Sequence, residues 1–246
     1  MRIRMKISFD GTAYNGWQIQ PDCKTIQGEI EAALSRLFDQ PIAVTGSSRT
    51  DTGVHALGMV AHTDIPPKFE LNDLEYKLNA ILPEDIAVRE TTEVREDFHA
   101  RYSAKGKRYE YRIVFDKSPK ERLGTHRINR PEYLPKVQMI LDDLAERIVG
   151  IHDFSAFARK AEIPDSPKCE ITLAKWQISG SGMVFAIEGN RFLHTMVRSL
   201  VGAMLDCIRG RFAPGQFGEM LVTGERKYGY EVAPGKGLWL VEVFYD

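Results

Sequence analysis

Residues 2–10, Arg-Ile-Arg-Met-Lys-Ile-Ser-Phe-Asp, begin the first of two similar runs of predicted secondary structure. Apolar and polar side chains alternate along this stretch, which predicts a strand. Residues 25–38 have apolar side chains at helical spacing and begin with Thr25, a suitable N-cap. The remaining elements complete a βαββαβ order: strands near 42–46 and 56–63, a helix near 71–82 and a strand near 85–94.

The second half of the chain repeats this order. Its predicted elements are a strand at 107–115, a helix at 132–148, strands at 169–179 and 183–188, a helix at 190–208 and a strand at 238–245. We therefore predict an α+β fold of two tandem ferredoxin-like halves, 1–100 and 101–246. No linker rich in proline or serine separates the halves, so we expect their antiparallel sheets to pair around a shared cleft.

Composition limits the function. With 43% hydrophobic and 27% charged residues, the 246-residue chain has the profile of an ordinary soluble protein. Three scattered cysteines are too few for a disulfide framework and favour a reducing compartment. The sequence contains no run of 18 apolar residues, so it predicts no membrane span, and we expect a cytoplasmic protein. Nucleotide-binding loops, metalloprotease motifs and nucleophile elbows are absent, and the six histidines lack metal spacing, so we expect no cofactor and no metal.

The net charge of −1 conceals a basic segment. Residues 101–130 contain ten Lys or Arg and three acids, a balance of +7. Such a run can simply be a solvated face. Here, however, the cations alternate with tyrosines, and RNA with unpaired bases requires both phosphate contacts and stacking surfaces. The candidate RNA-binding cations are Arg101, Lys105, Lys107, Arg108 and Arg112.

The loop Ser-Ser-Arg-Thr-Asp-Thr-Gly-Val-His-Ala, residues 47–56, contains a candidate catalytic acid. Asp51, two residues before Gly53, is most simply a turn aspartate. Alternatively, it is a reacting carboxylate that the neighbouring Arg49 keeps ionised.

Tyr109 lies in the basic segment and shares one strand face with residues 111 and 113. It is either a core aromatic residue or, given its cationic neighbours, a functional one.

The predicted helix near 190–208 has a continuous apolar stripe. His194 and Arg198 fall on the edge of this stripe, four residues apart. Arg198 forms either a structural salt bridge or a pair with the catalytic acid.

Four ordered segments together resemble the tRNA pseudouridine synthase A family over nearly the full length. They are Phe9-Asp10-Gly11-Thr12-x-Tyr14-x-Gly16-Trp17-Gln18-x-Gln20; Arg49-Thr50-Asp51-x-Gly53-Val54-His55-Ala56; Phe98-His99-Ala100-Arg101 with Lys107-Arg108-Tyr109-x-Tyr111; and Asn190-x-Phe192-Leu193-His194-x-Met196-Val197-Arg198 with Gly202.

The resemblance implies an enzyme that isomerises uridine to pseudouridine in the tRNA anticodon stem-loop, usually at positions 38 to 40. It implies that Asp51 is catalytic, that Tyr109 contacts the target base, that Arg49 helps to flip the nucleotide and that Arg198 pairs with the carboxylate. Such enzymes are homodimers without a cofactor. His55, within the second motif, is a further candidate for RNA contact.

Two residues differ from the family pattern: Ser48 stands where glycine is usual, and Thr52 where alanine is usual. These two differences are compatible with an alternative, a paralogue that acts on another uridine or another RNA. The alternatives from other classes are a non-catalytic RNA-binding protein with sheets of the RRM type and a ferredoxin-like enzyme acting on small molecules.

Overall fold

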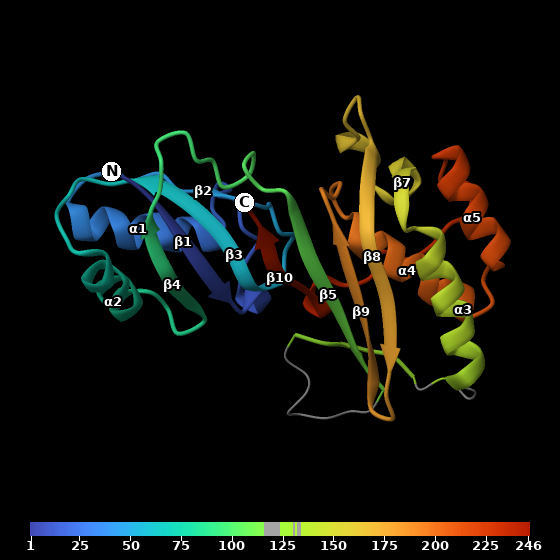
Figure 1. Ribbon diagram of the computed structural model, residues 1–246. Coiled ribbons are helices and arrows are strands. Elements are labelled where there is room, and N and C mark those ends of the chain that lie inside the picture. The colour runs from blue at the N-terminus through green and yellow to red at the C-terminus, as the bar shows by residue number, and fades with distance from the viewer. Residues whose placement is uncertain (116–123, 130, 132–133) are drawn as a thin grey trace. The chain divides into compact units, whose positions relative to one another are not determined.

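The computed structural model describes residues 1–115, 124–129, 131 and 134–246. These residues form two compact units (Figure 1). The first unit contains Met1–Lys105 and Trp239–Asp246, and the second contains Gly106–Leu238.

The first unit follows the predicted βαββαβ order and adds the final strand of the chain. Its elements are β1 (Arg2–Phe9), the 3₁₀ turn η1 (Gly11–Ala13), α1 (Ile26–Phe38), β2 (Thr45–Gly46), β3 (His55–Asp64), α2 (Leu71–Ile81), β4 (Ile86–Glu93) and β10 (Leu238–Phe244).

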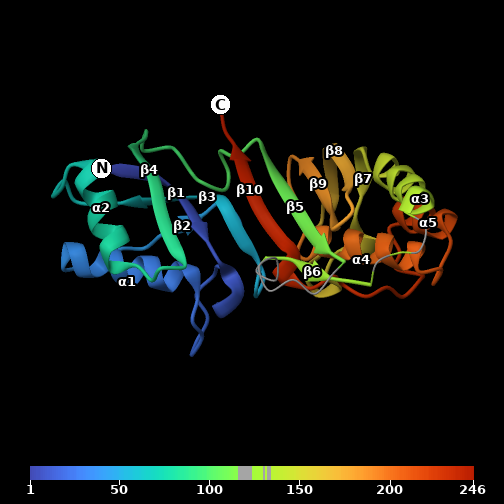
Figure 2. The ribbon, with the colours of Figure 1, turned by 90° about the horizontal axis from the view of Figure 1, so that it is seen from below.

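Strand β1 lies between β3 and β4 and pairs antiparallel with both. The other edge of β3 pairs with two short partners, β2 in the antiparallel direction and β10 in the parallel direction. Burial alternates along β1, with Ile3, Met5 and Ile7 fully buried, as its sequence predicts. Helices α1 and α2 pack against each other and α2 packs on β4 (Figure 2). Burial of each such aliphatic side chain stabilises the unit by roughly 1.5–3 kcal/mol.

The second unit contains a sheet in the order β5-β9-β8-β7, with β6 paired to the end of β5. Its elements are β5 (Gly106–Val114), β6 (His126–Arg127), α3 (Leu134–Arg147), β7 (Gly150–Asp153), the 3₁₀ turns η2 (Ser155–Phe157) and η3 (Lys160–Glu162), β8 (Lys168–Ile178), β9 (Gly182–Gly189), α4 (Met196–Ile208), α5 (Pro214–Thr223) and η4 (Gly235–Gly237). Helices α3, α4 and α5 pack against one another, and α3 also packs on β8.

The α+β prediction is confirmed, with differences in detail. The expected strand at 42–46 is reduced to Thr45–Gly46, and β6, β7 and α5 were not predicted. The closing strand β10, expected in the half 101–246, belongs to the first compact unit because Trp239 and Leu240 pair with β3.

Candidate active site

The loop between β2 and β3, residues 47–54, is held in place by the opening motif of the chain. The amide of Trp17 donates a hydrogen bond of 3.1 Å to the carbonyl of Thr50, and the amide of Gly53 donates one of 3.3 Å to the carbonyl of Tyr14. Two of the four sequence motifs therefore form one local structure.

Two glycines of the opening motif allow this close approach. A Cβ atom on Gly11 would lie 1.9 Å from the carbonyl oxygen of Val54, and one on Gly16 would lie 2.4 Å from that of Thr50. Gly16 also has a φ of +86°, which favours glycine. The shape of the loop thus depends on these two positions.

Asp51 begins a turn. The amide of Val54 donates a hydrogen bond of 3.1 Å to the carbonyl of Asp51, and Gly53 adopts a φ of +74°. The predicted turn is therefore present, but the backbone carbonyl closes it, so this bond does not require the half-buried carboxylate. Arg49, two residues earlier, is exposed.

His55 supports the loop from inside the unit. Its side chain is only 1% exposed, and its Nδ1 accepts a hydrogen bond of 3.2 Å from the amide of Gly11. Its ring stacks on Trp239 with centroids 4.4 Å apart. The expected direct contact between His55 and RNA does not fit this burial. The burial of His55 was not predictable from the local sequence, because Trp239 lies near the other end of the chain.

Two of the candidate RNA-binding cations belong to the first unit. Arg101 is exposed, and its guanidinium carbon lies 5.8 Å from the centroid of the Tyr102 ring. Lys105 is exposed and forms an ion pair of 2.9 Å with Asp246. A surface pair of this kind contributes little to stability, about 0–1 kcal/mol, and leaves the lysine accessible.

Tyr109 lies on the buried face of β5 in the second unit. It is 8% exposed, and its ring meets that of Phe192 edge-on, with centroids 5.1 Å apart and an interplanar angle of 82°. Residues 109, 111 and 113 share this face, as predicted. The neighbouring arginines, which argued against a core position, lie on the opposite face of the strand, so Tyr109 packs as a core residue does.

The opposite face of β5 carries a balanced cluster of charges. Arg112 donates to Glu110 at 2.8 Å, and Arg108 lies 3.8 Å from Glu110 and 3.4 Å from Glu188. Glu188 comes from β9, where it is the partner of Arg108 in the strand register. Two arginines and two glutamates have no net charge, so Arg108 and Arg112 are weaker attractors for phosphate than the sequence suggested.

The remaining basic candidate on β5 is Lys107, which is half-buried opposite Gly189. Part of the basic segment lies outside the described residues, namely Asp116, Lys117, Lys120, Glu121, Arg122 and Arg130.

Arg198 is fixed near the start of α4. Its Nε donates a hydrogen bond of 2.7 Å to the carbonyl of Ala233, and the amide of Ala233 donates one of 3.1 Å to the carbonyl of Arg198. The next residue, Pro234, accepts a hydrogen bond of 2.8 Å from the hydroxyl of Tyr111. Burial raises the pKa of that phenol, which keeps it a donor. The backbone at 233–234, which no sequence motif indicated, is thus held by both residues.

His194 and Arg198 were expected on the same helix, but His194 lies outside it. Helix α4 begins at Met196, because Thr195 adopts a left-handed conformation with a φ of 64°. His194 precedes the helix, and its Nδ1 lies 2.5 Å from a carboxylate oxygen of Glu162.

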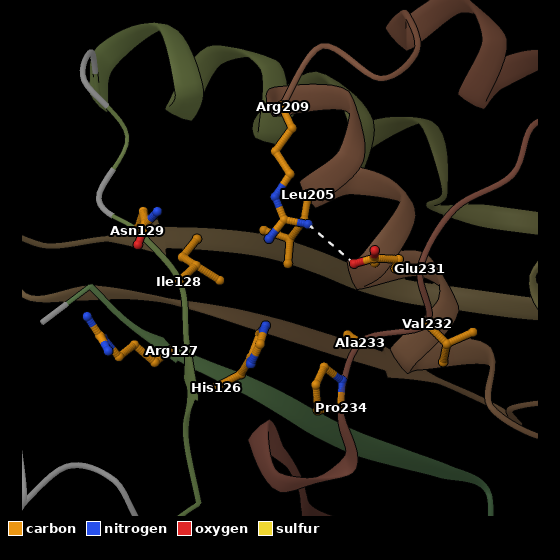
Figure 3. A pocket seen from close by; sticks show the side chains of 11 residues that line it. His126, Arg127, Ile128, Asn129, Leu205, Arg209, Glu231, Val232, Ala233 and Pro234 are labelled. Atoms are coloured by element: carbon orange, nitrogen blue, oxygen red, sulfur yellow. Dashed lines mark ion pairs between the residues drawn. The ribbon is translucent and has the colours of Figure 1, made fainter. Parts of the chain in front are cut away.

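A separate pocket of about 480 Å³ lies within the second unit (Figure 3). Arg209 and His126 are among its lining residues, and Arg209 also pairs with Asp206 at 3.1 Å. Burial, together with the positive charges of Lys236 and Arg209, lowers the pKa of His126 to about 4, so its ring is neutral at pH 7. None of the predicted catalytic or RNA-binding residues is among the residues that line this pocket.

Within the part of the chain that the structure describes, no group of three His, Cys, Asp or Glu residues could hold a metal ion. In the same residues, no helix is both long and apolar enough to cross a membrane.

Comparisons with known proteins identify the family. The family model described as tRNA pseudouridine synthase matches residues 5–103 and 144–246. Asp51 and Arg198 lie within these ranges, and Tyr109 lies between them.

Curated relatives match over the whole length. The chain is 38% identical over 249 residues to a protein of Bacillus subtilis named tRNA pseudouridine synthase A, with all of both chains covered. It is 36% identical over 249 residues to the protein of that name from Bacillus pumilus, again with all of both chains covered. The corresponding protein of Chlorobaculum tepidum is 38% identical, with 99% of this chain and 97% of the relative covered.

The chain therefore belongs to the tRNA pseudouridine synthase family. It is an isomerase that makes pseudouridine in tRNA. This excludes the two alternatives from other classes, a non-catalytic RNA-binding protein and an enzyme of small-molecule metabolism.

Proposed function

We propose that this enzyme isomerises uridines at positions 38 to 40 of the tRNA anticodon stem-loop, in the cytoplasm, and that Asp51 is its catalytic residue. The choice of uridines rests on the resemblance of the four motifs to the tRNA pseudouridine synthase A family. The role of Asp51 is supported by the geometry of its turn. The backbone carbonyl of Asp51 accepts the hydrogen bond that closes the turn, so the turn does not require the carboxylate for this bond.

The reaction needs an anion of defined position. The C1′–N1 bond of uridine must break, the uracil must turn, a C1′–C5 bond must form and the C5 proton must leave. An ionised Asp51 can attack C1′, add to the base or remove a sugar proton, and each of these routes uses the carboxylate. The backbone bonds from Trp17 and Gly53, which hold the loop, support a fixed direction for this group.

The other proposed roles divide between binding and chemistry. The target nucleotide must leave the base stack, which costs a few kcal/mol. Arg49 would offset part of this by filling the gap, and its exposure is compatible with that role. Tyr109 would contact the flipped base, and Arg198 would pair with the Asp51 carboxylate. A double-mutant cycle tests that pairing. If the two side chains form a pair, Arg198→Met should cost less stability in the Asp51→Asn variant than in the parent, so that the two effects on stability are non-additive.

Binding of tRNA is assigned to Arg101, Lys105 and Lys107, with smaller contributions from Arg108 and Arg112. The smaller contributions follow from the glutamates with which these two arginines are paired. The enzyme is proposed to act as a homodimer, which sedimentation equilibrium would test: a mass of one chain at micromolar concentration would contradict it.

Tritium release tests the reaction, and mapping tests its position. Transcripts of an anticodon stem-loop carry C5-tritiated uridine, with uridine present only at position 38, 39 or 40. Release from these transcripts, together with pseudouridine mapped at the same positions, is the expected result. Ser48 is buried and Thr52 is exposed in the loop. If they have changed the choice of uridine, bulk tRNA will release tritium and these transcripts will not.

A further inference from the structure

The segment after the Phe98-His99-Ala100-Arg101 motif forms a rigid turn in the first unit. The amide of Ser103 donates a hydrogen bond of 2.9 Å to the carbonyl of His99, and the amide of His99 donates one of 3.0 Å to the hydroxyl of Ser103. The His99 ring is also fixed, because its Nδ1 accepts hydrogen bonds from the amides of Arg101 and Tyr102, at 3.1 Å and 3.2 Å.

Three aromatic rings form a ladder from the core to the surface. The innermost is His62 of β3, which is 7% exposed and accepts a hydrogen bond of 3.1 Å from the amide of Ala100. The ring centroid of His99 lies 4.8 Å from that of His62 and 4.3 Å from that of Tyr102. The outermost ring, Tyr102, is 78% exposed.

The exposed Tyr102 ring has a defined neighbour on the inner side. A single exposed apolar or aromatic side chain is normal and by itself indicates no binding site. Tyr102 is instead held against a ring that backbone amides have already oriented. This contact restricts the conformational freedom of the Tyr102 ring before any ligand binds, which reduces the entropy that binding would otherwise lose.

A cation lies over the exposed ring. The guanidinium carbon of Arg101 is 5.8 Å from the Tyr102 centroid, and the Arg101 side chain is exposed. An exposed aromatic ring together with a guanidinium on a long, exposed side chain matches two features of an unpaired nucleotide, the base that can stack and the phosphate that carries negative charge.

We propose that Tyr102 and Arg101 form an RNA-stacking site, in which an unpaired base other than the reacting uridine stacks on Tyr102 and Arg101 contacts its phosphate. The proposal rests on the enzyme's use of RNA, but not on the choice of positions 38 to 40. Asp51, the proposed catalytic residue, belongs to a different loop of the same unit, and the role proposed for Tyr102 and Arg101 is binding and not bond breaking.

Substitutions of Tyr102 separate the ring from its hydroxyl. Tyr102→Leu should weaken binding of tRNA by about 5- to 150-fold, the range for loss of one stacked base. Tyr102→Phe should bind as the parent does. The control is Tyr76→Leu on α2, which removes a tyrosine of nearly equal exposure, 77%. It should leave the affinity for tRNA unchanged.

Two further readouts exclude a merely structural role. Tyr102→Leu should leave the slope of log Kd against log salt unchanged, because no charge is lost, whereas Arg101→Gln should lower it by about 0.7–0.9. A second readout uses a series of stem-loops with 2-aminopurine at successive unpaired positions. At one of these positions the parent and Tyr102→Phe should quench the fluorescence, and Tyr102→Leu should not.

The contrary results are equally defined. Affinity of Tyr102→Leu equal to the parent, or quenching by Tyr102→Leu at every position that the parent quenches, would overturn the stacking site. These measurements report binding and not turnover. A failure of the proposed function appears separately, as absence of tritium release from the stem-loop by the parent enzyme.

Discussion

The two regions that carry the proposed catalytic groups are built in different ways. In the first unit, backbone hydrogen bonds and glycines hold loop 47–54, and the carbonyl of Asp51 accepts the hydrogen bond that closes its turn. In the second unit, side-chain packing holds Tyr109, whose ring is buried against Phe192. A side chain on the loop can therefore be altered at little cost in stability, whereas Tyr109 serves the core in addition to its proposed role in the reaction.

The largest combined effect on stability and turnover should come from Gly11, the glycine that allows the loop its position. Gly11→Ala places a methyl group 1.9 Å from the carbonyl oxygen of Val54, so the backbone must move. Overpacking of this kind costs about 1–3 kcal/mol, and a displacement of about 1 Å at the reacting groups lowers turnover by about 100-fold. Thermal unfolding and tritium release measure the two effects.

Gly180→Ala is the matched control, because nothing lies within 4 Å of the added methyl group. It should change stability by less than about 0.5 kcal/mol. Equal stability and turnover in Gly11→Ala would show that the loop does not need its close contact with the opening motif.

Tyr109 should show the double role of the second region. Tyr109→Phe keeps the ring against Phe192, so we expect normal folding and tRNA affinity but loss of most turnover if the phenol moves a proton. Tyr109→Leu also removes the aromatic contact with Phe192. Its stability should fall by about 0.5–1.5 kcal/mol more than the loss of buried apolar area alone would cause. A fully active Tyr109→Phe enzyme would restrict this residue to packing or stacking.

The charged face of β5 should respond less than the exposed turn of the first unit. Loss of one phosphate contact lowers the salt slope of tRNA binding by about 0.7–0.9. Because Glu110 and Glu188 already neutralise Arg108 and Arg112, the double variant Arg108→Gln/Arg112→Gln should lower the slope by less than the single Arg101→Gln. A larger decrease in the double variant would mean that these arginines leave their glutamates for RNA.

The effect that is smallest at pH 7 concerns the pH dependence of stability. The pKa of His126 is lowered from 6.5 to about 4 in the folded protein. Between these values the unfolded chain binds a proton that the folded chain does not, so this residue destabilises the fold as pH falls from about 6.5 to 4. Urea unfolding should show that His126→Gln loses less stability than the parent over this interval. An equal loss would remove His126 from the acid response.

Much of this architecture was predictable because it depends on local patterns. The alternation in β1 and the helical spacing in α1 are local features, and both elements lie where the sequence predicts them. Helix α5 also has local signals in its sequence, Pro214 in its first turn and Gly224 at its C-cap. The start of α4 had no such signal, because a left-handed threonine is rare and depends on its surroundings.

The site was less predictable because its contacts join distant segments. The motifs indicated Asp51 and Arg198, but the burial of His55 depends on Trp239, and the neutralisation of Arg108 depends on Glu188 of another strand. Tertiary contacts of this kind are not encoded in the spacing of residues along one element.

The most direct test of the account is turnover by Asp51→Asn, measured as tritium release from C5-labelled tRNA. The substitution keeps the shape of the side chain and the carbonyl that closes the turn, so stability and tRNA affinity should equal those of the parent. The matched control, Asp22→Asn, changes an exposed aspartate with a φ of 56°, a conformation that asparagine tolerates, and should be fully active. The account predicts that Asp51→Asn binds tRNA and releases no tritium. Appreciable release by this folded variant would contradict the central claim that the Asp51 carboxylate carries the reaction.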